Sequence, residues 1–191
     1  SARRIVVDGR TLAFLLGGDA PDARLDGLVR VVRAGSAAGE DALSRPTRDL
    51  AAVLARAGPP PFVHLAGADP AARREVAVAA AARLGRAVLD LRADDLPGDW
   101  TQRHALAVLL DRELALSGAV ALFECDEGDA GRAARLAEAM TGPVVASAAE
   151  ALRVERSPCA RIELPPLDAA ARRAIWRRAL GDDHPAADPA V

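Results

Sequence analysis

The stretch FVHLAGADPAARREVA, residues 62–77, decides the fold. It opens with an apolar run typical of a buried β-strand, and a helical pattern follows from Asp69 to Leu84. A strand that runs through a glycine-containing turn into a helix is the building unit of parallel sheets covered by helices. In many proteins such a turn binds a nucleotide phosphate.

The same alternation of strand and helix continues towards the C-terminus. The patterns predict strands at 62–67, 86–91, 119–124, 143–147 and 160–164, and helices at 69–84, 101–116, 131–140 and 167–180. The strands follow one another at the spacing of β-α units. The fold class is therefore α/β, a three-layer α-β-α sandwich around a parallel five-stranded sheet.

The N-terminal part of the chain lacks this alternation. Residues 1–58 are expected to form a small, mainly helical segment, which ends where Gly58 is followed by three prolines. The α/β domain would then span 59–181, followed by a disordered tail at 182–191. Within the N-terminal segment we expect a helix at 3–16, an extended stretch at 28–41 and an amphipathic helix at 48–57.

Composition narrows the classes of protein. The 191 residues are 51% hydrophobic but only 3% aromatic, which predicts an aliphatic core. The net charge of -2 and the scattered arginines argue against nucleic acid as a partner. We find no signal peptide and no apolar stretch long enough to span a bilayer. Cys125 and Cys159 lack metal-ligand spacing and suit a reducing compartment, so we expect a cytoplasmic protein and no membrane partner.

The chain contains no lysine, because all 25 of its basic residues are arginines. A coding bias towards arginine codons explains the absence of lysine at surface positions. At a chemical site the two side chains are not equivalent, since arginine is a planar fork and lysine a compact ammonium group. Any mechanism that needs a lysine from this chain is excluded.

This absence matters most at the turn after residue 66, which matches the spacing of the phosphate-binding loop G-x-x-x-x-G-K-[S/T]. Gly67 takes the first position, whereas Ala72, Arg73 and Arg74 replace the second glycine, the lysine and the hydroxyl residue. Ala72 adds a Cβ where phosphate must approach, and Arg74 cannot bind magnesium. The turn is either a plain structural turn or a divergent nucleotide site in which Arg73 replaces the lysine.

Two further strand ends carry polar candidates. Glu124, supported by Glu127, stands where an ATPase would hold magnesium, and Ser147 stands where a polar residue contacts the γ-phosphate. Glu124 also suits a solvated loop at the start of a helix, and Ser147 also suits ordinary packing at a strand end. Arg153 and Arg156 lie where an arginine finger would project, although surface salt bridges explain them as well.

An ordered set of segments resembles the AAA ATPases over about residues 60–181. The set comprises FVHLAGADPAARREVA, AVLDLRADDL, ELALSGAVALFECDE, PVVASAAEAL and RIELPPLDAAARRAIWRRAL. It is most similar to the degenerate first AAA domain of tandem-AAA proteins encoded with contractile injection systems. The resemblance implies the strand order 5-1-4-3-2, a nucleotide crevice at the carboxyl ends of the central strands, and assembly into rings, usually hexameric.

Three functions remain open. The favoured one is a non-catalytic, pseudo-ATPase scaffold or regulatory domain without a cofactor, which docks onto other AAA domains of its polypeptide, onto further copies or onto a protein client. The second is a domain that binds ATP or ADP with magnesium, and the third is a small-molecule α/β enzyme, for which no nucleophile and base are recognisable. Candidate docking residues are Phe14, Leu15, Leu16 and Trp176, although core packing also explains them.

Overall fold

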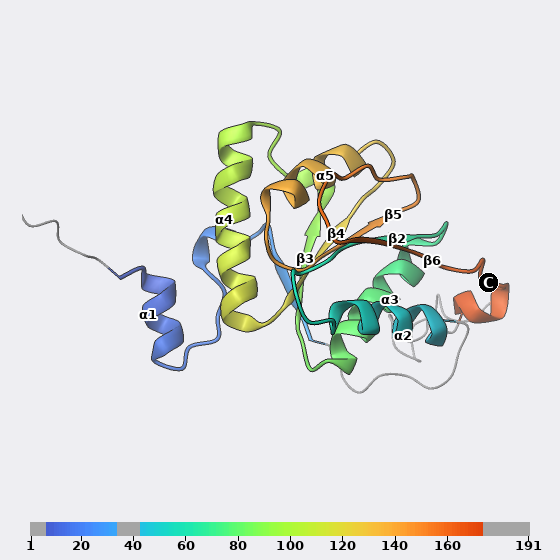
Figure 1. Cartoon of the computed structure of the whole chain (residues 1–191), viewed down its shortest axis with the longest axis horizontal. Helices are drawn as coiled ribbons and strands as arrows, with labels where there is room; N and C mark the ends of the chain where they lie inside the picture. The colour runs from blue at the N-terminus through green and yellow to red at the C-terminus, as the bar shows by residue number, and fades with distance from the viewer. Residues whose placement is uncertain (1–6, 34–42, 174–191) are drawn as a thin grey trace, which may run out of the picture.

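The computed structural model describes residues 7–33 and 43–173, which form three layers (Figure 1). A central sheet lies between helices α2 and α3 on one face and α4 and α5 on the other. This is the predicted α-β-α sandwich. The predicted tail at 182–191, and the part of the last predicted helix beyond 173, lie outside the described residues.

The sheet has six strands in the order β1-β3-β4-β5-β2-β6. Their bounds are β1 Arg30–Val32, β2 Phe62–Ala66, β3 Val88–Arg92, β4 Val120–Glu124, β5 Val144–Ala148 and β6 Cys159–Glu163. The last five are parallel, and among themselves they follow the predicted order, with β2 between β5 and β6. Their carboxyl ends therefore meet at one edge of the sheet.

The prediction of five strands, all parallel, is wrong in one respect. Strand β1 pairs antiparallel with β3 and covers an edge that would otherwise be free, with Val31 opposite Leu89. This strand comes from the stretch 28–41, which was predicted to be extended but not to join the sheet. A run of three residues carries too little pattern to reveal its partner, because the pairing depends on a strand almost 60 residues away.

The main helices begin and end close to the predicted positions. They are α2 Ser44–Leu54, α3 Pro70–Arg83, α4 Trp100–Ser117 and α5 Ala130–Ala139. Side chains of Asp69 and Asp99 cap α3 and α4, and Gly118 ends α4 in the left-handed conformation with φ +66°. Helix α2 starts and stops a few residues before the predicted 48–57. A further helix starts at 169, where Asp168 accepts the Ala171 N–H at 2.7 Å.

Each face of the sheet has its own apolar core. On the face covered by α4 and α5, Phe123 and Leu91 of the sheet share a core with Leu110 and Leu136 of these helices. On the other face, Val63, Leu65 and Leu122 of the sheet share a core with Leu50 of α2 and Val76 of α3. Alanines fill much of the remaining space, as the composition predicts. The two cores hold the strand ends rigidly, so the side chains at the carboxyl edge have fixed positions.

The N-terminal segment is divided between the layers and the outside of the molecule. Strand β1 and helix α2 pack with the α/β layers, whereas α1, Gly9–Leu15, lies outside α4 (Figure 1). The short helix η1, Ala23–Leu25, buries Leu25 in the core. The domain boundary at residue 58 stays a prediction. No helix in 7–33 or 43–173 combines the length and apolar character needed to cross a bilayer.

Candidate functional site

The turn between β2 and α3 is shaped by contacts within the chain. Gly67 has φ +157°, and a Cβ at this position would lie 3.0 Å from the Cβ of Leu164. Leu164 follows β6, and its backbone N–H donates to the Ala66 carbonyl at 2.8 Å. The glycine is thus explained by the close approach of the chain after β6.

The amino end of α3 is capped by a carboxylate of its own chain. Asp69 Oδ1 accepts the backbone N–H of Ala72 at 3.1 Å, and Pro70 has no N–H to offer. A phosphate bound at a helix amino terminus would use these same donors. Ala72 itself is buried, and its methyl group belongs to the core beneath α2 and α3.

Arg73 points into the protein. Only 4% of its surface is exposed. Its Nε donates to Ser147 Oγ at 2.9 Å, and its Nη1 donates to the carbonyl oxygen of Gly67. Burial lowers the pKa of this guanidinium, and both of its hydrogen-bond partners are neutral. Arg73 therefore joins the turn to the end of β5.

Arg74 belongs to a separate charged group at the ends of β3 and β4. Its Nη2 donates to Asp90 Oδ2 at 2.9 Å, and the same oxygen accepts Arg30 Nη2 at 2.7 Å. The Nε of Arg74 lies 2.8 Å from Glu124 Oε1, although the two atoms are not aligned for a hydrogen bond. Arg74 neutralises two carboxylates that would otherwise repel each other.

Glu124 is half-buried and lies among opposing charges. Burial raises the pKa of its carboxyl group and the charge of Asp90 adds to this effect, while Arg74 opposes it. Next in the chain, burial raises the pKa of the Cys125 thiol to about 12, so this side chain is neutral. Within the described ranges, no three His, Cys, Asp or Glu side chains are grouped as metal ligands would be.

A pocket of about 390 Å³ lies beside these charges. Its walls come from the loop before β1 and from Arg30, Asp90, Arg92, Asp95 and Glu124. The turn residues 67–74 do not line it. The arginines of this wall already face carboxylates, since Arg30 pairs with Asp90, and Arg92 pairs with Asp94 and with Asp126 at 3.1 Å.

The six predicted site residues all lie at the carboxyl edge of the sheet, but in two groups. Gly67, Arg73 and Ser147 form one, with Ala72 directly behind them, and Arg74 and Glu124 form the other. Glu124 and Ser147 are opposite each other in the ladder between β4 and β5. The strand-end pattern thus predicted where these residues meet, but the binding roles considered for them stay untested.

The candidate arginine finger Arg156 is a structural residue. Its guanidinium donates to four backbone carbonyls, those of Ala137, Pro60, Thr141 and Gly142. It lies in no ion pair among the described residues, so the expectation of a surface salt bridge is wrong for it. Burial lowers the pKa of Arg156. Arg153 is exposed.

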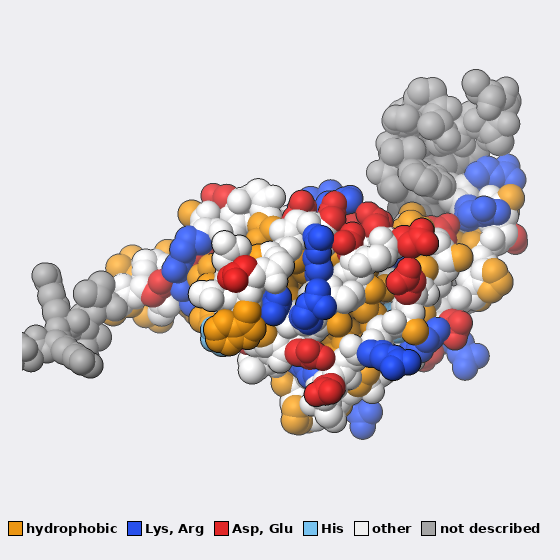
Figure 2. All heavy atoms as spheres, turned by 90° about the horizontal axis from the view of Figure 1, so that it is seen from above, with side chains coloured by type: hydrophobic (Ala, Val, Ile, Leu, Met, Phe, Trp, Pro, Cys, Tyr) orange, Lys and Arg blue, Asp and Glu red, His pale blue; other side chains and the backbone are white. Residues whose placement is uncertain are grey.

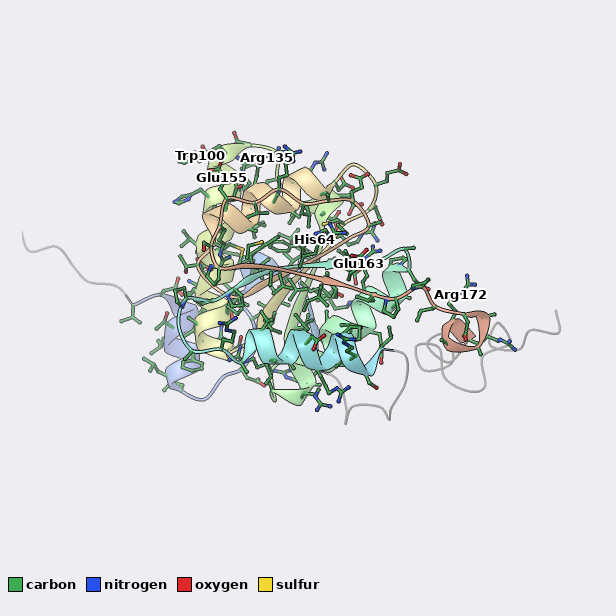
Figure 3. All side chains as sticks on the ribbon, turned by 45° about the vertical axis from the view of Figure 1, so that its right-hand side comes forward. His64, Trp100, Arg135, Glu155, Glu163 and Arg172 are labelled. Atoms are coloured by element: carbon green, nitrogen blue, oxygen red, sulfur yellow. The ribbon has the colours of Figure 1, made fainter. Side chains whose placement is uncertain are left out.

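His64 is a core residue, as expected for a histidine within a strand. Figure 3 places it in the sheet, between the helical layers, and its Nε2 donates to the Ala148 carbonyl at 3.2 Å. Burial lowers the pKa of His64, and the charges of Arg161 and Arg73 lower it further.

The sequence reasoning missed Asp69 as the anion at the turn, and Asp90 and Arg30 as partners of Arg74. A signal for Asp90 was available. It stands inside the apolar strand VLDLR, and a carboxylate buried in a strand needs cationic partners. The signal for Asp69 was its place before Pro70 at the start of the helix, which is typical of a cap.

No protein-family model matches the chain, and no curated protein matches it. The solved structures that are similar to it include two that it matches over most of its length. The structure of a Rhizobiales Trip13 is 20% identical, covers 85% of this chain and 73% of its own, and has a TM-score of 0.38. The crystal structure of the FIGL-1 AAA domain in complex with ADP is 13% identical, covers 93% and 69%, and has a TM-score of 0.48.

The proteins that this chain is similar to thus include an AAA domain, the class that its sequence resembles. Both identities are below 25% and both TM-scores are below 0.5.

Proposed function

We propose that this chain is a non-catalytic AAA-type domain, a pseudo-ATPase module that acts as a scaffold or regulator within a larger ATPase. The observation that carries the proposal is the position of Arg73. The residue that would have to replace the catalytic lysine instead donates to Ser147 and to Gly67 of its own turn. Its charge is used to hold two strand ends together.

Magnesium nucleotide does not fit the other residues of the turn. A phosphate at the start of α3 would meet the carboxylate of Asp69, which already accepts the Ala72 N–H. Like charges so close together repel strongly where water is partly excluded. The hydroxyl that would hold magnesium is replaced by Arg74, and Glu124 faces that arginine.

In this role the domain contributes shape and surface, and hydrolysis belongs to another AAA domain of the same polypeptide. The resemblance to the first domain of tandem-AAA proteins of contractile injection systems suggests ring assembly or docking of an injection-system component as the setting. The competing function is a divergent nucleotide site in which Arg73 binds ATP or ADP.

Isothermal titration calorimetry with ATP and with ADP, each with and without magnesium, separates the two. We expect no binding heat up to millimolar nucleotide and no nucleotide-dependent rise in melting temperature. Magnesium-dependent binding that is lost in Arg73→Ala would establish the competing function instead.

A restored loop tests whether Asp69 excludes phosphate. Ala72→Gly, Arg73→Lys and Arg74→Thr together turn residues 67–74 into the full phosphate-loop pattern. We expect this triple variant to remain without binding heat, because Asp69 still occupies the helix terminus. Adding Asp69→Gly removes that carboxylate, and binding that appears only then would show that the cap excludes phosphate.

A further inference from the structure

Strand β6 leaves one edge of the sheet unpaired. Within 7–33 and 43–173, no strand pairs with its outer side. The opposite edge belongs to β1, which has three residues, whereas β6 has five. Strand β6 pairs residue for residue with β2, from Phe62 with Cys159 to Ala66 with Glu163, so no bulge interrupts it. It therefore offers the longer of the two edges, in front of β2 in Figure 1.

The register fixes which backbone groups of β6 point outward. Phe62 N–H donates to the Pro158 carbonyl at 2.9 Å, and Leu164 N–H donates to the Ala66 carbonyl at 2.8 Å. In a parallel ladder, successive residues bond alternately to the two sides, so the even-numbered residues of β6 bond to β2. The N–H and C=O groups that point away from β2 belong to Cys159, Arg161 and Glu163. Among the described residues these groups have no hydrogen-bond partner.

A hollow of about 740 Å³ lies beside this edge, between α2 and the chain after β6. Its apolar walls come from Pro46, Ile162, Leu164, Pro165 and Pro166. The side chains of Ile162 and Leu164 belong to the core shared with α2 and α3, which holds them in place. The hollow therefore has room for an apolar side chain next to the unpaired backbone groups.

Charged side chains of β6 accompany the free backbone groups. Arg161 Nη2 lies 3.8 Å from Glu163 Oε1, and both side chains are exposed. Residues directly opposite each other on two strands interact, so the edge favours a strand with a carboxylate opposite Arg161 and a cation opposite Glu163.

Other parts of the surface select a partner less clearly. On the face that Figure 2 shows, arginines and carboxylates are interspersed, which does not favour a polyanion. The docking candidates Phe14, Leu15 and Leu16 are exposed, but they would suit any apolar partner. The edge of β6 is more selective, because it requires N–H and C=O groups at the spacing of a strand.

We propose that β6 binds an extended segment of another protein as a seventh strand of the sheet. The backbone of the segment pairs with the outward groups of β6, and an apolar side chain enters the hollow beside α2. Its charged side chains complement Arg161 and Glu163. Main-chain hydrogen bonds then supply affinity, and the hollow and the charges supply specificity.

A second copy of β6 fits this edge less well. Neighbouring strands lie about 4.8 Å apart, whereas packed helices lie about 8–10 Å apart. Helix α2 packs against β6, so two copies joined through this strand would bring their α2 helices into conflict. A single extended segment brings no helix with it.

The inference gives the docking role proposed above a surface. It requires no statement about nucleotide, and its test contains none. Failure of one proposal is thus distinguishable from failure of the other.

A synthetic peptide of the required pattern, acetyl-Val-Lys-Val-Glu-Val-Thr-amide, tests the proposal on the 191-residue chain. Antiparallel to β6, it places its Glu opposite Arg161 and its Lys opposite Glu163. An NMR titration should give a dissociation constant in the micromolar to millimolar range, with the largest amide shifts at the outward residues of β6. The same peptide with an N-methyl group on its Glu loses a donor that faces β6 and should not bind.

Two variants of one residue isolate the edge. Arg161→Pro removes an outward N–H but no hydrogen bond to β2, so the chain should stay folded and lose peptide binding. Arg161→Gln keeps the N–H and loses only an exposed charge, so its affinity should stay within about five-fold of the wild type. Circular dichroism shows that each variant is folded.

Three results would overturn the proposal directly: no binding at millimolar peptide, equal binding of the N-methylated peptide, or full binding by Arg161→Pro. Sedimentation equilibrium of the chain without peptide excludes the other occupant. We expect the mass to stay at 19.8 kDa. A mass that rises with concentration in the wild type and not in Arg161→Pro would assign the edge to a second copy instead.

Discussion

The two ends of this molecule each contain a buried arginine, but the partners of the two side chains differ. At the β2–α3 turn, Arg73 donates to a hydroxyl and a carbonyl, both neutral. In the N-terminal segment, Arg10 meets the carboxylate of Glu113. A buried ion pair loses far more when one partner is removed, because the remaining charge stays buried alone. The comparison therefore predicts that the free energy of unfolding depends more on Arg10 than on Arg73.

The largest effect is expected for Arg10→Ala. The variant removes the hydrogen-bonded partner of the buried Glu113 carboxylate and leaves only the more distant Arg112, whose Nη2 lies 3.9 Å away, so the free energy of unfolding should fall by about 3 kcal/mol. Urea unfolding followed by circular dichroism measures this change.

The matched control is Arg10→Met combined with Glu113→Leu. Replacing a buried ion pair by apolar side chains of similar size is often neutral, so this double variant should regain most of the lost stability. A double variant as unstable as Arg10→Ala would show that the pair is needed for its geometry and not for charge compensation.

The second prediction concerns the turn. Arg73→Met removes hydrogen bonds to neutral partners and also removes a buried charge, so the loss should be about 1.5 kcal/mol, half of that expected at Arg10. A double-mutant cycle with Ser147→Ala should give a coupling of about 1 kcal/mol between the two side chains. If Arg73→Met costs as much as Arg10→Ala, the comparison between the two arginines fails.

The layers of the fold were largely predictable from the sequence, and the edge strand was not. Most of the parallel strands lie in apolar runs bounded by glycine, proline or acidic residues, and these local signals put the predicted ends close to the observed ones. Strand β1 has three residues, and its place in the sheet depends on Asp90 and Leu89 far along the chain. Local patterns do not contain such pairings.

The candidate site was predictable in position but not in the direction of its side chains. The spacing from Gly67 to Arg74 placed the turn correctly at the sheet edge. Whether Arg73 points outward to a ligand or inward to Ser147 depends on where β5 lies, which the turn sequence does not encode. The same holds for Arg156, whose four carbonyl partners come from residue 60 and from the stretch 137–142, two separate parts of the chain.

The smallest predicted effect is on the pH dependence of stability. It sharpens the comparison most, because it reports on the charge of Arg73 itself. His64 lies in β2, which leads into the turn, and its folded-state pKa is lowered by burial and further by Arg161 and Arg73. The unfolded chain, with a histidine pKa of about 6.5, therefore binds a proton more readily than the folded chain. Stability is then full above this pKa and falls as the pH decreases through it.

Between pH 7 and pH 6 the free energy of unfolding should fall in the wild type. His64→Gln keeps a side-chain donor for the Ala148 carbonyl but does not titrate, so its stability should change less over this range. In Arg73→Met a neighbouring positive charge is gone, the pKa of His64 rises, and the pH dependence should shrink. If the free energy of unfolding of Arg73→Met changes with pH as much as that of the wild type, the neutral partners of Arg73 screen its charge from β2. The two buried arginines would then differ less than the difference between their partners suggests.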